Sequence, residues 1–299
     1  MTSPTPHHLT PLDWVRWVIP GVVWGTSFFF IAEGLEAFPA ILITPMRIGF
    51  GFITLAMVPA TRRVRMERSD WPRVTLLGLI WMAIPLSLFP FAEQSVSSSV
   101  TGMLNGATPI FVTTVAASMA RRMPRARQLV GLAVGFAGVV LIALPSGAGG
   151  DNSWGGIGLI FIALVFYGFA LNVAVPLQQK YGALATMWRV QGVAFVLTAP
   201  LTIGSFDDVE FAWGPFAAMI GLGVLGTALA YVMMADNAGR LGSSRASASV
   251  YLIPVVSLLL GALVRGESVE VLSVLGCAVA LAGAYVATST ASPAPSTDR

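Results

Sequence analysis

Two arginines lie inside long apolar stretches of the sequence, where a charged side chain is costly unless it has a partner. Arg47 lies about seven residues into one stretch and Arg189 about six into another. Such a guanidinium faces a partner or a wet cavity. It can bind a carboxylate through two parallel hydrogen bonds, or it can snorkel and hold backbone carbonyls at a corner of a bundle. We therefore assign both residues to gating or ligand binding, or to structural anchoring.

Neutral polar and aromatic side chains in similar stretches could bind a small amphipathic molecule. Asn105 lies in mid-stretch and shares a helix face with Thr101 and Thr108. Tyr251 follows Ser247 by four residues, which again predicts one face. The candidates for substrate binding are Trp24, Trp81, Asn105, Tyr167, Tyr231 and Tyr251. Packing or interhelical hydrogen bonding is the alternative role for each.

Three prolines interrupt apolar stretches: Pro85, Pro109 and Pro254. Proline removes a backbone donor and kinks a helix. Carbonyls freed at such a break can line a cavity within a membrane bundle. We expect these prolines at gating or structural positions.

The sequence lacks the usual residues of enzyme, metal and nucleotide chemistry. His7 and His8 both precede the first apolar stretch, and Cys277 is single. The pattern GxGxxG at 221–226 lies within an apolar stretch instead of following a strand, so it is no dinucleotide fingerprint. We predict no enzymatic activity, no metal and no cofactor. The arginines of the short loops indicate membrane topology and not a nucleic acid partner.

The composition is that of an integral membrane protein. Of 299 residues, 56% are hydrophobic and 10% charged, whereas soluble domains carry about 25% charged residues. Ten stretches approach the roughly 20 residues that a spanning helix needs. They cover residues 14–32, 40–60, 74–92, 98–119, 127–144, 154–175, 183–203, 213–234, 245–264 and 270–288.

The loop charges reverse between the two halves of the chain. The loop at 62–73 carries five arginines, whereas its counterpart at 207–210 carries only carboxylates. The loop at 121–127 is basic, and its counterpart at 265–270 is net acidic. Because short cytoplasmic loops are rich in Lys and Arg, the two halves are expected to have opposite orientations, with both termini in the cytoplasm.

Sequence matches between the halves support the same arrangement. Three pairs of identical residues are separated by the same offset of 145 positions: Pro109 with Pro254, Gly131 with Gly276, and Gly138 with Gly283. Arg47 matches Arg189 at an offset of 142. We predict an all-α integral membrane protein of ten transmembrane helices in two inverted five-helix repeats, 14–144 and 145–288, around a central cavity. A cytoplasmic tail (1–13) and a disordered tail (289–299) flank the repeats.

One long motif resembles a known transporter family. Residues 246–255 read ASASVYLIPV, and Gly261, the Gly266–Glu267 pair, Gly276 and Gly283 follow. Together with a looser copy at 97–109 and with Trp24-Gly25 and Arg47, this resembles the EamA-type drug/metabolite transporters. In the first half, Arg121-Arg122 replaces the Gly-Glu pair. We attribute this departure to topology.

The resemblance implies a bacterial inner-membrane exporter. Members of the family export small metabolites, amino acids among them, and the aromatic amino acid exporters have ten spans arranged as a basket around a cavity. The implied function is efflux of a neutral or aromatic amino acid, or of a similar amphipathic metabolite.

Every Asp and Glu falls in a loop or near a span end, with Glu93 and Asp236 at the border. We therefore predict alternating access without ATP and without obligatory proton coupling. The alternatives are proton-coupled export of a purine, nucleoside, sugar or cationic drug, and a channel. The expected partners are a small-molecule substrate and the lipid bilayer, with the protein a monomer or weak dimer.

Overall fold

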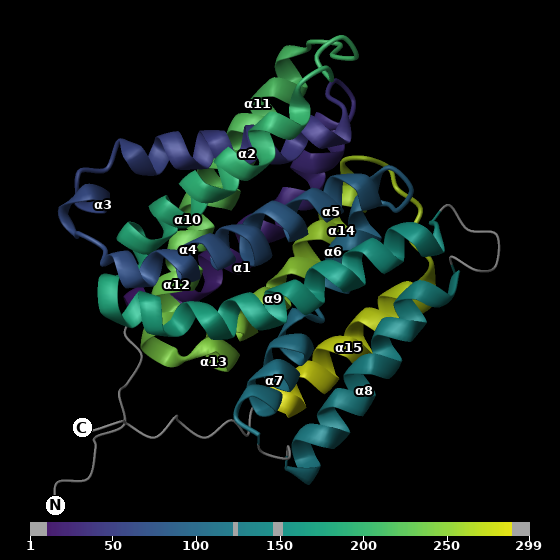
Figure 1. Cartoon of the computed structure of the whole chain (residues 1–299). Helices are drawn as coiled ribbons and strands as arrows, with labels where there is room; N and C mark the ends of the chain where they lie inside the picture. The colour runs from purple at the N-terminus through teal and green to yellow at the C-terminus, as the bar shows by residue number, and fades with distance from the viewer. Residues whose placement is uncertain (1–10, 122–124, 146–151, 289–299) are drawn as a thin grey trace, which may run out of the picture.

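The structure is a computed structural model that describes residues 11–121, 125–145 and 152–288, and its regular elements in these ranges are all helical (Figure 1). Residues 1–10 and the predicted tail at 289–299 lie outside the described residues. The α-helices are α1 (Pro11–Gly34), α2 (Ala40–Ala56), α3 (Ala60–Arg63), α4 (Trp71–Leu77), α5 (Ile84–Glu93), α6 (Ser98–Asn105), α7 (Thr108–Met119), α8 (Ala126–Ala143), α9 (Trp154–Tyr181), α10 (Ala183–Thr198), α11 (Trp213–Gly221), α12 (Ala230–Leu241), α13 (Ser243–Ser247), α14 (Ile253–Leu263) and α15 (Val271–Thr288).

Each predicted apolar stretch lies on one of these helices or on a run of them. Six runs are long and apolar enough to cross a membrane: Arg68–Glu93, Ser98–Met119, Ala126–Ala143, Trp154–Tyr181, Ala183–Thr202 and Trp213–Leu241. The shorter apolar helices are Val18–Gly34, Ala40–Ala56, Ser249–Leu263 and Val271–Ala287. That all ten cross the bilayer, and that the halves are inverted repeats, stays a prediction.

The three prolines stand where helical runs change geometry. Pro85 follows the π-helical segment η2 (Gly78–Ala83), Pro109 follows the turn between α6 and α7, and Pro254 follows the 3₁₀ segment η6 (Ala248–Leu252). Each lies in the first turn of the α-helical segment that it begins, next to the change in helix geometry. A second π-helical segment, η5 (Leu222–Leu229), joins α11 to α12. The irregular turns thus lie within long apolar runs.

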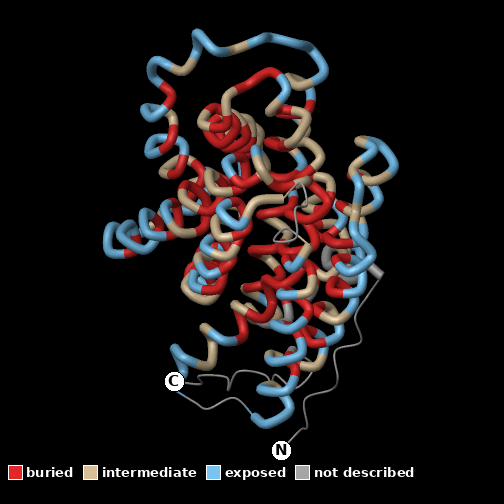
Figure 2. Tube along the Cα trace, turned by 90° about the vertical axis from the view of Figure 1, so that its right-hand side faces the viewer, coloured by how far each residue is buried: buried red, intermediate tan, exposed pale blue. Residues whose placement is uncertain are grey.

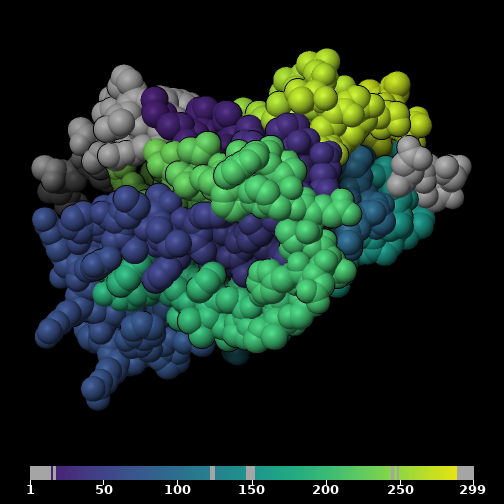
Figure 3. All heavy atoms as spheres, turned by 90° about the horizontal axis from the view of Figure 1, so that it is seen from above, coloured from purple at the N-terminus to yellow at the C-terminus, as the bar shows by residue number. Residues whose placement is uncertain are grey.

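The two halves of the chain interleave in one bundle. Helix α1 packs on α14 and α12, and α2 packs on η5 and α10. Seen from above, the green atoms of α11 lie between the purple N-terminal helix and the blue-violet α2 (Figure 3), in agreement with its contacts to both. Buried residues gather along the inner sides of the helices, and exposed ones along the outer turns (Figure 2). The centre of the bundle is therefore built by both halves.

Helices α8 and α15 form a close pair at one side of the bundle (Figure 1). Glycines allow the approach: a Cβ atom on Gly283 would lie 2.1 Å from the backbone nitrogen of Gly135. A Cβ atom on Gly138 would lie 2.2 Å from the backbone nitrogen of Ala280. The small-residue spacing of α8 therefore serves an intramolecular helix contact.

The loops are sorted by charge between the two ends of the bundle. At the end we name the acidic end, the backbone nitrogen of Glu210 donates to the carbonyl of Ala37 at 3.0 Å, and Arg265 forms ion pairs with Glu33 and Glu36. At the other end, the arginine-rich loop 57–70 meets the ends of α9 and α10. Which end faces the cytoplasm stays a prediction.

Asp70 connects the arginine-rich loop to α9. Its Oδ2 accepts hydrogen bonds from the Tyr181 hydroxyl at 2.6 Å and from Lys180 Nζ at 2.8 Å. We expect Asp70→Asn to lower the free energy of unfolding, and by more than Glu67→Gln does, since it removes a charged acceptor from two donors. Glu67→Gln is the control, because Glu67 is 62% exposed and also faces Lys180. Denaturation in detergent would compare the two variants. Equal losses of stability would contradict the role of Asp70 in connecting the arginine-rich loop to α9.

Candidate functional site

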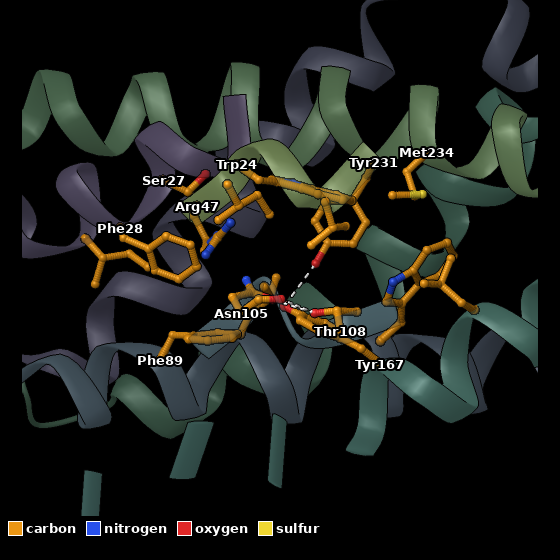
Figure 4. Close-up of a pocket in the computed structure, with 16 residues that line it drawn as sticks. Trp24, Ser27, Phe28, Arg47, Phe89, Asn105, Thr108, Tyr167, Tyr231 and Met234 are labelled. Carbon is orange, nitrogen blue, oxygen red and sulfur yellow. Dashed lines mark hydrogen bonds between the residues drawn. The ribbon is translucent and has the colours of Figure 1, made fainter. Parts of the chain in front are cut away.

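A narrow cavity lies in the centre of the bundle, where helices of both halves meet (Figure 4). Its volume is about 40 Å³, which is room for a few waters. The lining residues are Trp24, Ser27, Phe28, Ile31, Arg47, Trp81, Leu86, Phe89, Asn105, Thr108, Tyr167, Leu171, Tyr231, Met234, Val250 and Ile253. The structure is therefore closed around the site, and a larger ligand requires the helices to separate.

Arg47 is the cation of the cavity and is only 2% exposed. Its Nε donates to the Thr227 hydroxyl at 3.2 Å, and that hydroxyl donates to the carbonyl of Leu222 at 3.1 Å within η5. Gln191 donates to the Thr227 carbonyl at 2.7 Å. Within the described residues, no carboxylate lies at ion-pair distance from Arg47. A buried guanidinium with one hydrogen bond is suited to receive an anionic ligand.

Aromatic rings form the walls beside Arg47. The rings of Trp24 and Trp81 meet that of Tyr231 edge to face, with centroids 5.0 and 5.6 Å apart. Phe89 stacks on Tyr167 at 6.0 Å, and the two tyrosine hydroxyls are 3.4 Å apart. Trp24 Nε1 donates to the carbonyl of Gly226 at 2.9 Å, so its ring is held in place. This geometry suits an apolar or aromatic group with a polar end.

Asn105 adds an amide to the cavity at the junction of α6 and α7. Its Oδ1 accepts a hydrogen bond from the Thr108 hydroxyl at 2.7 Å, which orients the amide. Its Nδ2 makes no hydrogen bond within the described residues. The amide can therefore donate to a ligand.

Five of the six predicted substrate-binding residues line the cavity, and Tyr251 does not. The expectation for Tyr251 rested on α-helical spacing from Ser247. The chain is a 3₁₀ helix from Ala248 to Leu252, with about three residues per turn. This turns Val250 and Ile253 to the cavity instead.

The two arginines have different surroundings. Arg189 lies at the arginine-rich end and donates to the carbonyls of Ala185, Thr61 and Val64 at 2.7, 3.4 and 2.5 Å. It is a structural anchor in this conformation, whereas Arg47 faces the cavity. The prolines do not line the cavity, but their neighbours Leu86, Thr108 and Ile253 do.

Sequence reasoning missed Ser27, Phe28 and Ile31 as lining residues. Their spacing from Trp24 is three, four and seven residues, which is one helix face. That periodicity in α1 was the signal that could have found them.

A second hollow, the acidic vestibule, opens at the acidic end. Its volume is about 690 Å³, and its charged lining residues are Glu36, Glu93, Asp208, Glu210, Glu267 and Arg265. Of the two borderline carboxylates, Glu93 lines this vestibule, whereas Asp236 is 41% exposed and pairs with Arg240. No described cluster of three or more His, Cys, Asp or Glu is placed to hold a metal ion.

Glu267, which lines the vestibule, accepts hydrogen bonds from the N-terminus of α6. Its two oxygens accept from the backbone nitrogens of Ser98 and Ser99 at 3.1 and 2.9 Å, and from both hydroxyls at 2.6 Å. Burial alone would raise the pKa of Glu267, but these four hydrogen bonds outweigh it and hold the pKa below its ordinary value. The carboxylate therefore stays ionised at neutral pH.

Glu267→Gln is expected to lower the free energy of unfolding by about 2 kcal/mol, because an amide cannot accept all four bonds. Since the folded pKa is depressed, the wild-type stabilisation is complete above about pH 4.3 and fades as the pH falls through the lower folded value. Glu270→Gln is the control at an exposed position of the same loop. Thermal unfolding from about pH 2 to about pH 8 would test this, because the difference between wild type and Glu267→Gln should shrink only below about pH 4.3. A loss between about pH 6 and pH 8 would contradict it.

Comparisons with known proteins agree with this architecture. The sequence pattern of the EamA-like transporter family matches residues 15–144 and again residues 154–289. A solved crystal structure matches with a TM-score of 0.68 and 17% identity, over 92% of this chain and 95% of its own, so the fold is shared.

Curated relatives match over almost their full lengths. A probable terminal-alkyne amino-acid exporter of Streptantibioticus cattleyicolor is 26% identical, over 89% of this chain and 90% of its own. An uncharacterized transporter of Archaeoglobus fulgidus is 24% identical, over 91% and 97%. The uncharacterized inner membrane transporter YedA of Escherichia coli is 24% identical, over 83% and 81%. These relatives are described as transporters, and one of them as a probable amino-acid exporter.

Proposed function

The chain belongs to the EamA-like transporter family, and from that premise we propose that it exports small amphipathic metabolites, with neutral or aromatic amino acids as the first candidates. The proposal includes ten spans in two inverted repeats, residues 14–144 and 145–288, in the bacterial inner membrane with both termini in the cytoplasm. The two separate family matches and the opposite loop charges support this arrangement. The amino-acid exporter among the relatives supports the substrate class.

The proposal rests on one observation: the guanidinium of Arg47 and the aromatic rings of Trp24, Trp81 and Tyr231 line the same closed cavity. A substrate carboxylate would bind the guanidinium of Arg47, since no carboxylate of the described residues lies at ion-pair distance from it. An apolar side chain would lie against Trp24, Trp81 and Tyr231, and the Asn105 amide would donate a hydrogen bond to an acceptor oxygen of the substrate. An amphipathic zwitterion combines these features.

Transport would proceed by alternating access, because the cavity is closed and lies between the two halves. The side chains that line it in the described part of the chain include no carboxyl or imidazole group. Substrate would therefore move down its own gradient without obligatory proton coupling and without ATP.

Counterflow in proteoliposomes tests this function. Vesicles loaded with unlabelled phenylalanine should accumulate external labelled phenylalanine transiently and saturably, without any ion gradient. Absence of counterflow across neutral and aromatic amino acids, with the protein monodisperse and folded, would refute the substrate class. Accumulation that requires a pH gradient would indicate antiport, and flux that does not saturate would indicate a channel.

A further inference from the structure

Glu93 is the last residue of α5 and lies between the central cavity and the acidic vestibule. It follows Phe89, a lining residue of the cavity, by four residues, and so lies about one turn further along the same face. Glu93 itself lines the vestibule. Glu93 therefore lies about one helical turn from the cavity and in the wall of the vestibule.

The carboxylate of Glu93 is enclosed and has no partner. Both of its oxygens are shielded from solvent, and neither accepts a hydrogen bond within the described residues. An enclosed acceptor without a donor is costly in a folded protein. Structural carboxylates are bonded, as Glu267 is by Ser98 and Ser99, so Glu93 contributes no such stabilisation here.

Neither nearby arginine reaches the oxygens of Glu93 in this structure. Arg265 pairs with Glu33 and Glu36 across the acidic end, and its Nε is 3.8 Å from Glu267. Arg47 faces the central cavity. In this conformation neither arginine supplies the donor that Glu93 lacks, and a ligand could supply it.

The field around Glu93 favours a cation. The vestibule is lined by five carboxylates and a single arginine, Arg265, within the described residues. A negatively charged cleft concentrates cations and guides them inward. The described residues hold no group of three or more His, Cys, Asp or Glu placed for a metal ion, and the amino acids proposed above carry an ammonium, so an ammonium is the cation that we consider.

We propose that Glu93 is an ammonium-binding group on the route between the cavity and the acidic end, so that the exported substrates carry a free amine. An ammonium has three N–H donors and would satisfy the enclosed oxygens when the route opens. This inference rests on the proposed export function and adds to it: Arg47 takes the carboxylate in the cavity, and Glu93 takes the amine during exit.

Binding of two half-substrates to the purified protein tests the assignment. Phenethylamine has the ammonium without the carboxylate, and 3-phenylpropionate has the reverse. By calorimetry, Glu93→Gln should weaken phenethylamine binding about tenfold or more, because a charged hydrogen bond is lost. Binding of 3-phenylpropionate should change less than about twofold. Glu210→Gln is the matched control, because it removes the same charge from an exposed position of the same vestibule.

Three results would overturn the assignment. They are a wild-type protein that does not bind phenethylamine, equal affinity in wild type and Glu93→Gln, and equal losses in Glu93→Gln and Glu210→Gln. If Glu93→Gln instead removed only a pH dependence of transport, Glu93 would carry a proton and the amine assignment would be wrong. Phenylalanine counterflow by the wild type distinguishes failure of the amine assignment from failure of the proposed export function, because export does not require Glu93 to bind the amine.

Discussion

Replacing Arg47 by glutamine is expected to lower kcat/KM for a carboxylate substrate at least about 100-fold, because a buried charge-assisted pair is worth about 3–5 kcal/mol when one partner is removed. Arg47→Lys should recover only part of the loss, since an ammonium cannot form the two parallel bonds of a guanidinium. Initial rates of labelled phenylalanine counterflow would measure both variants.

The same variant should not destabilise the protein. Arg47 has one hydrogen bond and no ion pair within the described residues, so its removal relieves the cost of burying a charge. We expect the unfolding midpoint of Arg47→Gln to equal or exceed that of the wild type. Replacement of a structural arginine should instead lower the unfolding midpoint. Arg189→Gln is the comparison, because it leaves three backbone carbonyls without their hydrogen-bond donor. A less stable Arg47→Gln with normal transport would contradict the ligand-binding role.

The second large effect concerns the α8–α15 pair. Gly283→Ala should lower the free energy of unfolding by about 3 kcal/mol or more. Its Cβ would lie 2.1 Å from the nitrogen and 2.5 Å from the Cα of Gly135. Backbone atoms cannot rotate away as a side chain can, so the helices would have to separate.

Gly158→Ala is the matched control for that substitution. Gly158 also lies within a helix, α9, but a Cβ atom there meets nothing within 4 Å. Alanine is the better helix former by about 1 kcal/mol, so this variant should be as stable as the wild type or more stable. Thermal unfolding followed by the monodisperse fraction in detergent would rank the three proteins. Equal midpoints for the two variants would show that the glycine contact is not tight.

Much of this arrangement could be predicted from apolar stretches and loop charge. Stretch lengths located the helices because a membrane-spanning helix has a narrow range of lengths. Mid-stretch position located Trp24, Trp81, Asn105, Tyr167 and Tyr231, since polar and aromatic groups in such places tend to face the interior. Tyr251 lies outside the lining of the cavity because the spacing rule assumes α-helical geometry and the chain is 3₁₀ there.

The roles of the two arginines could not be separated from sequence. Arg47 and Arg189 lie at similar depths in matching stretches, yet one faces the cavity and the other holds the loop near Val64. The difference depends on which carbonyls and rings the tertiary fold brings near each side chain. The ion pairs of Arg265 with Glu33 and Glu36 were equally hidden, because they join residues more than 200 positions apart.

Those ion pairs at the acidic end have a consequence for the salt sensitivity of the transporter. Arg265 and Glu33 are 23% and 28% exposed, and Glu36 is 55% exposed. At 0.15 M salt the screening length is about 8 Å, and it shortens to about 3 Å at 1 M. Arg47 is shielded from such screening by its burial. In the alternating-access cycle proposed above, concentrated salt on the side of the acidic end would weaken these ion pairs and leave Arg47 unaffected. Ionic strength on one side of the membrane would then bias the direction in which the empty carrier faces.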